Sequence, residues 1–340
     1  MSPPRPVVWT GESVRLLDQT ALPRRLIEVE IRELDDLVAA IRRLVVRGAP
    51  AIGVAGAYGV ALALRQRARE GWAEATFAAA LNRLRAARPT ALALALGVDA
   101  ARAQVGAGLG AVVAVGHRLA EDDERANRAI GRHGADWITA RLGTRPLRLL
   151  THCNTGALAT AGWGTALGII HELHERRLVD VVHVNETRPL LQGSRLTAWE
   201  LAQAGIDHRI QPDGAAAAAI VGGLIDAAVV GADRIAANGD VANKIGTLGV
   251  ALACAHAGVP FVVAASASTV DPALPSGAGI PIEQRAADEV LAVGGQRFAP
   301  AGARVYNPAF DVTPAALVSA LITELGAGLP GPAGPPGQPG

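Results

Sequence analysis

Apolar and polar residues alternate along three short stretches near the start of the chain. The stretches are VVWT, SVRLLDQ and RRLIEVEI, and Gly11 and Pro23 lie between them. A period of two places every second side chain on one face of a strand, and glycine and proline end such runs. The pattern predicts a small antiparallel sheet.

The periodicity becomes helical after Leu34. Asp35 or Asp36 is placed to cap a helix that runs through Leu44, because a carboxylate at this position accepts bonds from the first free backbone amides. Further helices rich in alanine, leucine and arginine are expected as far as Leu142.

The longest uncharged apolar run covers residues 49–64 and contains Pro50 and three glycines. It is shorter than the roughly 20 residues that a membrane span needs. We therefore expect a buried helix and no membrane association.

A different pattern begins at Pro146. Short runs of leucine or β-branched residues (LRLLTHC, VVHVNE, AAVVGAD and PFVVAAS) are each followed by a loop and an alanine-rich stretch. This alternation predicts an α/β fold, a Rossmann-like doubly wound parallel sheet. Ligands bind at the carboxyl ends of such strands, where the segments THCNTG, NETRP, GADR and SAST fall.

The two patterns predict two domains and a tail. Residues 1–144 form an α+β domain with the short antiparallel sheet, and residues 145–327 form the Rossmann-like catalytic domain. Residues 328–340 contain dense glycine and proline, with glycine at every third position of GLPGPAGPPGQPG. That run is too short for a collagen helix, so we expect a disordered tail.

Composition narrows the function. The 32 basic and 31 acidic side chains are mixed along the chain and leave a net charge of +1, which disfavours a nucleic-acid partner and favours a small polar substrate. The two cysteines have no CxxC spacing, and the first fifteen residues lack the apolar core of a signal peptide. Both features predict a cytoplasmic protein.

Cys153 follows an apolar strand and precedes a glycine-bearing turn. Polar neighbours and a helix starting after the turn would favour its thiolate, which makes a reactive thiol plausible. A small buried side chain with no chemical role is an equally good interpretation, since free cysteines are often buried.

Asp233 follows the apolar segment AAVVGA, so its carboxylate is predicted at the tip of a buried strand. Desolvation there would raise its pKa and suit it to general acid-base chemistry. The alternative is a structural aspartate that pairs with Arg234 or caps a turn.

Two segments have the composition of anion sites. Asn243 and Lys244 precede the start of a helix whose amides could hold a phosphate, and Arg47 precedes Gly48, Ala49 and a proline that opens another helix. Arg47 and its neighbours are weak evidence alone.

Two other motifs are discounted. Gly162, Gly164 and Gly168 imitate a dinucleotide-binding fingerprint, but they lie too far after the strand and in the wrong spacing. His171 and His174 are spaced by one helical turn and lack a nearby third ligand. We expect no nicotinamide cofactor and no metal.

An ordered series of segments resembles the methylthioribose-1-phosphate isomerase family, which shares its fold with regulatory subunits of the translation-initiation nucleotide exchange factor. The segments are VRGAPAIGVAGAYG, RPTA, AEDDERANRAIGRHGA, LLTHCNTGALATAGWGTALG, VNETRPLLQGSRLTAWEL, GADRIAANGDVANKIGT, IPIEQRAADEV and NPAFDVTPAALVSALITE. They extend through nearly the whole chain.

The resemblance implies roles for particular residues. Cys153 would be the catalytic thiol and Asp233 the proton donor. The residues that would bind the sugar phosphate are Arg47, Gly48, Ala49, Arg88, Gln192, Asn243 and Lys244. Arg88 and Gln192 are candidates through the resemblance alone.

The implied activity is conversion of 5-methylthioribose 1-phosphate to 5-methylthioribulose 1-phosphate in methionine salvage, by a cytoplasmic homodimer without a cofactor. One alternative is an isomerase of the same fold that acts on 5-deoxyribose 1-phosphate or ribose 1,5-bisphosphate. A non-catalytic subunit that senses sugar phosphates is an alternative of another class.

Two segments depart from the family pattern. LALALGVDAA follows RPTA where relatives carry an asparagine and bulky aromatic residues, and residues 266–269 read SAST where a proline is usual. The first departure would reshape the pocket for the 5-substituent, and the second would change loop stiffness.

Overall fold

The computed structural model describes residues 4–88 and 91–331. The described chain divides into two compact units. Unit 1 extends to Asn127 and includes Thr155–Gly164, and unit 2 contains Arg128–Asn154 and the chain from Thr165 onward. The domain boundaries predicted at residues 144 and 327 stay predictions. Residues 332–340 of the predicted tail lie outside the described residues.

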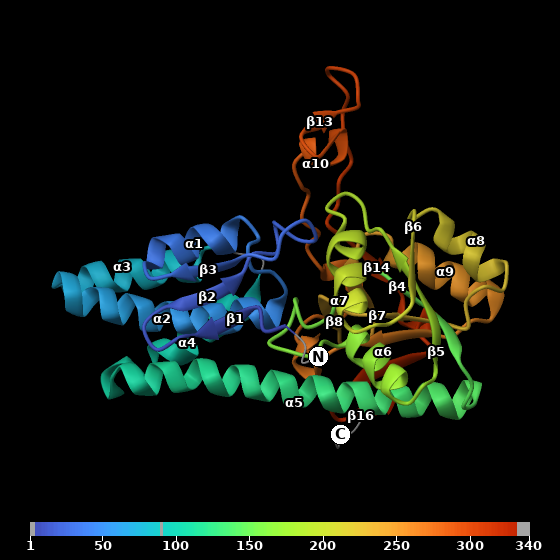
Figure 1. The fold of residues 1–340 in the computed structure, drawn as a ribbon, viewed down its shortest axis with the longest axis horizontal. Coiled ribbons are helices and arrows are strands. Elements are labelled where there is room, and N and C mark those ends of the chain that lie inside the picture. Colours follow the sequence, from blue (N-terminus) through green and yellow to red (C-terminus); the bar gives the residue numbers. More distant parts are fainter. Residues whose placement is uncertain (1–3, 89–90, 332–340) are drawn as a thin grey trace. The chain divides into compact units, whose positions relative to one another are not determined.

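Unit 1 combines a small sheet with helices. The antiparallel sheet has the order β1-β2-β3, and it confirms the alternating pattern of the first three stretches. Figure 1 shows the strands β1 to β3 and the helices α1 to α3 of this unit in blue and cyan. Its elements are β1 (Val7–Trp9), β2 (Val14–Leu17), β3 (Glu28–Ile31), α1 (Leu34–Arg42), α2 (Ala49–Glu70), α3 (Glu74–Arg85), α4 (Leu92–Arg102), the 3-10 helix η1 (Val105–Ala107) and the first part of α5 (Leu109–Leu142).

The helix predictions for unit 1 are largely confirmed. The apolar run forms α2, which is buried from Ala51 to Ala63. The predicted cap of α1 is wrong: Glu33 occupies the cap position, and Asp35 and Asp36 lie in the first turn. Carboxylates in a first turn still interact favourably with the helix dipole, which explains their place in the sequence.

Unit 2 is built on a parallel sheet with the order β16-β15-β10-β7-β4-β5-β6, in which only β16 is recorded as antiparallel to its neighbour. A smaller sheet has the order β11-β8-β9-β14. The elements of unit 2 after the end of α5 are β4 (Leu147–Thr151), α6 (Ala166–Glu175), β5 (Val179–Asn185), the π-helix η2 (Gly193–Thr197), α7 (Ala198–Gln203), β6 (His208–Gln211), α8 (Ala215–Val221), β7 (Ala227–Val230), β8 (Arg234–Ala236), β9 (Val241–Lys244), α9 (Thr247–Ala257), β10 (Phe261–Ala264), η3 (Ala267–Thr269), β11 (Val270–Asp271), η4 (Gly277–Gly279), α10 (Asp288–Leu291), β12 (Ala292–Val293), β13 (Gln296–Arg297), β14 (Phe310–Thr313), η5 (Ala315–Leu317), β15 (Ala320–Thr323) and β16 (Gly326–Gly328).

Successive side chains of the central strands enter two different cores. Leu149 and Val229 pack with residues of α5 and α6, whereas Leu150 and Val230 pack with residues of α8 and α9. Strands buried on both faces have continuous apolar sequences, as observed here. The predicted doubly wound α/β class is therefore confirmed.

The connections after two strands differ from the prediction. β7 leads into the antiparallel pair β8 and β9 before α9, and β10 leads into the short helix η3 and β11. Gly239, with a φ of +87°, lies in the turn between β8 and β9. The carboxyl ends of β4, β5, β7 and β10 nevertheless share one edge, because these strands are mutually parallel.

Candidate active site

Cys153 lies just after β4, in a turn with a left-handed backbone. Its φ is +65°, which costs about 1 kcal/mol or more for a residue with a Cβ atom, and the residue is 6% exposed. Its N–H donates to Thr187 Oγ1 at 2.9 Å, and its carbonyl accepts from Thr197 Oγ1 at 2.6 Å. These bonds from two other segments hold the thiol-bearing turn.

The predicted helix start beside Cys153 is wrong. The segment after Cys153 forms turns and a bridge between Gly156 and Gly164, and α6 begins only at Ala166. Glycine permits the positive φ of +92° at Gly164, so this segment folds as a loop. The dipole of α6 therefore does not begin at the thiol.

Gln192 precedes a tight turn of π-helix. A Cβ atom at the next position, Gly193, would lie 1.7 Å from the Asn185 carbonyl oxygen, so the backbones touch there. Gln192 is 6% exposed, and its Oε1 has no hydrogen-bond partner among the described residues. A buried acceptor without a partner is costly, and a ligand hydroxyl would satisfy it.

Lys244 ends β9 and contacts the residue before β14 and the first residue of that strand. Its Nζ donates to the Ala309 carbonyl at 2.9 Å and lies 4.6 Å from the centroid of the Phe310 ring. The preceding Asn243 is buried and donates to Thr247 Oγ1 at 3.0 Å. The lysine is therefore ordered by specific contacts.

Two of the amides at the start of α9 are already bonded. Asp311 accepts from the N–H of Gly246 at 2.7 Å and of Leu248 at 3.1 Å. Burial raises the pKa of Asp311, while these two backbone bonds lower it. A phosphate at these amides would have to displace a carboxylate, contrary to the expectation from the sequence.

Asp233 lies between β7 and β8, and its N–H donates to the Ala242 carbonyl at 2.9 Å. The residue is exposed, so burial predicted from the apolar strand before it is wrong. The chain leaves the sheet at this point, which carries the side chain beyond the packed core. Arg234 is the partner suggested if Asp233 has only a structural role. Its Nε lies 3.6 Å from Asp271 Oδ2.

Unit 1 contains the other four predicted binding residues. Arg47, Gly48 and Ala49 lie at the N-terminus of α2, and Arg88 follows α3 and is partly buried. Gly48 has a φ of +88°, and a Cβ atom there would lie 1.9 Å from the Ala159 carbonyl oxygen. A helix N-terminus favours an anion, and the glycine lets the chain approach the neighbouring loop.

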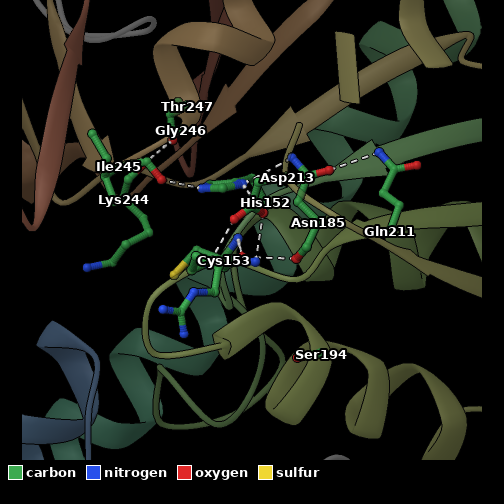
Figure 2. Close-up of polar contacts among 12 residues, drawn as sticks. His152, Cys153, Asn185, Ser194, Gln211, Asp213, Lys244, Ile245, Gly246 and Thr247 are labelled. Atoms are coloured by element: carbon green, nitrogen blue, oxygen red, sulfur yellow. Dashed lines mark hydrogen bonds and ion pairs between the residues drawn. The ribbon is translucent and has the colours of Figure 1, made fainter. Parts of the chain in front are cut away.

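A buried histidine joins the predicted residues of unit 2. His152 bonds to the carbonyl of Ile245, the residue after Lys244, and to Asn185 at the end of β5 (Figure 2). From the sequence, His152 was predicted only as a polar neighbour of Cys153, and no role was predicted for Thr187, Thr197 or Asp311. Thr187 was visible as a polar residue after a strand, whereas Thr197 lies in η2 and Asp311 lies in β14, and the partners of all three are distant in sequence.

The described residues include no group of three or more His, Cys, Asp and Glu side chains that could hold a metal ion. Desolvation, with a smaller effect from His174, lowers the pKa of His171 to about 4. Both cysteines are free thiols. Within the part of the chain described, no helix is long and apolar enough to cross a bilayer.

The strand order of the large sheet and the polar residues at its strand ends define the class of protein: a doubly wound α/β protein with its candidate site at one edge of the sheet. The chain belongs to the initiation factor 2 subunit family, whose model matches residues 45–330. The family resemblance inferred from the motifs is thereby confirmed.

Two individual relatives have names that are more specific than the family description. Methylthioribose-1-phosphate isomerase of Anaeromyxobacter sp. (strain K) is 52% identical over 95% of this chain and 94% of its own length. A probable bifunctional methylthioribose-1-phosphate isomerase/methylthioribulose-1-phosphate dehydratase of Nocardia farcinica is 51% identical over 94% of this chain, which spans 58% of that protein.

Two solved structures are similar over nearly their whole lengths. The 5-methylthioribose 1-phosphate isomerase from Pyrococcus horikoshii OT3 has a TM-score of 0.87 at 37% identity, with 96% of this chain and 93% of that one covered. The translation initiation factor eIF-2B, subunit delta, from A. fulgidus has a TM-score of 0.84 at 40% identity, with 95% of each chain covered.

Proposed function

We propose that this protein is an aldose-ketose isomerase that converts 5-methylthioribose 1-phosphate to 5-methylthioribulose 1-phosphate. The observation that carries the proposal is the identity of 52%, over nearly both whole chains, with a relative named for this activity. The ordered, strained turn at Cys153 and the fixed Lys244 in the same unit support it.

The reaction moves one hydrogen from C2 to C1 of the sugar, so it needs no external oxidant or reductant. Asp233 protonates the ring oxygen and opens the ring, and it regains a proton from the C2 hydroxyl as the ketone forms. Cys153 removes the C2 proton as a thiolate and returns it to C1, or it stabilises a direct hydride shift.

Binding is assigned to groups that suit a phosphorylated sugar. Lys244, Arg47 and Arg88 supply positive charge for the phosphate, with the backbone of Gly48 and Ala49 at the start of α2. The buried Oε1 of Gln192 accepts from a sugar hydroxyl, and the amide of Asn243 completes the set. The enzyme acts in methionine salvage as a cytoplasmic homodimer.

Two alternatives share this fold. An isomerase specific for 5-deoxyribose 1-phosphate or ribose 1,5-bisphosphate would use the same phosphate-binding residues. A subunit without catalysis is favoured by the similarity to the A. fulgidus structure, whose title names a translation initiation factor subunit.

One experiment separates these functions. Turnover of the three sugar phosphates is followed by NMR with the purified protein, without added metal or nucleotide. Strong preference for 5-methylthioribose 1-phosphate supports the proposal, and preference for another sugar changes the substrate. No turnover of any of them contradicts an isomerase and favours the subunit.

A further inference from the structure

The side chain of His152 is enclosed at the edge where the strands of unit 2 end. The residue is 0% exposed. Its Nε2 lies 2.8 Å from the Ile245 carbonyl oxygen, and its Nδ1 lies 3.1 Å from Asn185 Nδ2. The imidazole of the residue before Cys153 is therefore in contact with the residue after Lys244.

The partners of the ring determine its protonation. A carbonyl oxygen only accepts hydrogen bonds, so Nε2 carries the proton, and an amide nitrogen only donates, so Nδ1 is bare. The Asn185 orientation is supported by Gln211, whose Nε2 donates to Asn185 Oδ1 at 2.9 Å and whose Oε1 lies 3.0 Å from His183 Nδ1. The bonds thus run in one direction to Ile245.

Charged groups around the ring oppose each other. Asp213 Oδ1 lies 4.0 Å from Nδ1 of His152 and favours a proton there, whereas Lys244 disfavours it. Burial is the largest effect and lowers the pKa of His152. Asp213 is itself engaged, since it accepts from the N–H groups of Thr187 and Arg188.

The ring also sets the position of the turn after Lys244. Gly246 has a φ of +105°, and a Cβ atom there would lie 2.9 Å from Cε1 of His152. β4 and β9 belong to different sheets, so no described ladder holds them in register. In Figure 2 the side chains of Cys153 and Lys244 both extend toward the left of the view, away from Gln211.

We propose that His152 is a positioning residue that fixes the spacing between the Cys153 thiol and the Lys244 ammonium through its bond to the Ile245 carbonyl. The proposal rests on the function proposed above. A misplacement of about 1 Å between groups that act together costs on the order of 100-fold in rate.

The test compares two amide replacements of different reach. The amide of Gln in His152→Gln can occupy the place of Nε2 and donate to Ile245, whereas the shorter Asn in His152→Asn cannot. His171→Gln is the matched control, because it removes another histidine whose pKa burial lowers. We expect kcat/KM per folded molecule to fall about 100-fold in His152→Asn, less than about 10-fold in His152→Gln, and hardly at all in the control.

Two readouts do not depend on turnover. The ¹⁵N shifts of His152 in the wild type should report a neutral ring protonated at Nε2 at pH 7. Iodoacetamide should alkylate Cys153 at least about five times faster in His152→Asn than in the wild type or control, because the turn that shields the thiol loosens. Peptide mass spectrometry separates Cys153 from Cys254.

The outcomes are distinct. Equal kcat/KM in the Asn and Gln variants, or a ring protonated at Nδ1, would overturn the positioning role. If the wild type turns over none of the three sugars, the proposed function fails, and the NMR and alkylation results alone decide the role of His152. If His152→Asn does not fold, His152→Gln with a normal alkylation rate and the wild-type ring state support the proposal, and an altered rate opposes it.

Discussion

At the residue scale, the site depends on side chains whose freedom has been removed. Cys153 adopts a left-handed backbone between two threonine hydroxyls, and Thr187, one of these, has a φ of +66° itself. Strain of this kind persists only where surrounding bonds over-determine it, and it is concentrated at functional sites. The fixed backbone orients the Cys153 thiol, which a cysteine buried only for packing would not require.

The first prediction concerns the two reacting groups. Cys153→Ser and Asp233→Asn should each lower kcat by at least about 100-fold, because each removes a proton-transfer or charge-stabilising group while keeping the side-chain volume. Steady-state kinetics measure the loss and circular dichroism checks the fold. Cys254→Ala is the control, since Cys254 lies buried on α9 and should not affect turnover. Near-normal activity in either variant refutes its role.

The second prediction concerns pH. Desolvation lowers the pKa of His171 from 6.5 to about 4, so between these values the unfolded chain binds more protons than the folded one. The free energy of unfolding should therefore fall as the pH drops from 7.5 to 5, and His171→Gln should reduce this fall by about 2 kcal/mol. Urea unfolding at both pH values measures the difference. An identical pH dependence in wild type and variant contradicts it.

At the element scale, short irregular segments place the functional groups on a regular sheet. The π-helix η2 follows Gln192 and contributes Thr197, which bonds to Cys153. Single turns of π-helix are frequent at functional sites. The antiparallel pair β8 and β9 folds the chain back on itself, so that Asp233, before β8, lies beside the end of β9 that carries Lys244.

The third prediction tests the contact between η2 and β5. Gly193→Ala should reduce the stability of the protein by at least about 2 kcal/mol and lower turnover, because its Cβ would lie 1.7 Å from the Asn185 carbonyl oxygen. Gly249→Ala in α9 is the control: nothing lies within 4 Å of its Cβ position, and the change should be neutral or stabilising by up to about 1 kcal/mol. Thermal unfolding compares the two. Equal effects would contradict the close approach.

At the scale of the whole molecule, the proposed substrate-binding residues are divided between the two units. Arg47, Gly48, Ala49 and Arg88 belong to unit 1, and the thiol and the remaining residues belong to unit 2. The chain crosses between the units within α5 and again on either side of Thr155–Gly164. Because these four residues are proposed to act in binding alone, substitution of Arg47 or Arg88 should raise KM more than it lowers kcat, which steady-state kinetics measure.

The fourth prediction concerns assembly. The purified protein should have twice the mass of one chain in light scattering, because large apolar side chains are exposed on the surface of the single chain. Among the described residues these include Leu252, Phe298 and Tyr306. If the Phe298 side chain is covered in the dimer, Phe298→Glu should lower the measured mass toward that of one chain. A monomeric mass at micromolar concentration would contradict the proposal.

The amino-acid order alone determined the fold class, the parallel strands and the segments that carry polar residues at their ends. Periodicity and strand composition are local properties, and they survive in the folded chain because each core demands them. The positions of Cys153 after a strand and of Lys244 before a helix were visible in this way, whereas Gln192 was a candidate through the resemblance alone. The resemblance of the motifs supplied the family.

Only the tertiary structure decided which of these groups are bonded, buried or exposed. It placed Asp233 in an exposed position, bonded Asp311 to two amides at the start of α9 and joined His152 to Ile245. His152 and Ile245 are 93 positions apart in the chain, and hydrogen bonds over such distances depend on how strands from separate sheets meet. Local sequence patterns do not predict such contacts between sheets, because the packing of the whole unit determines them.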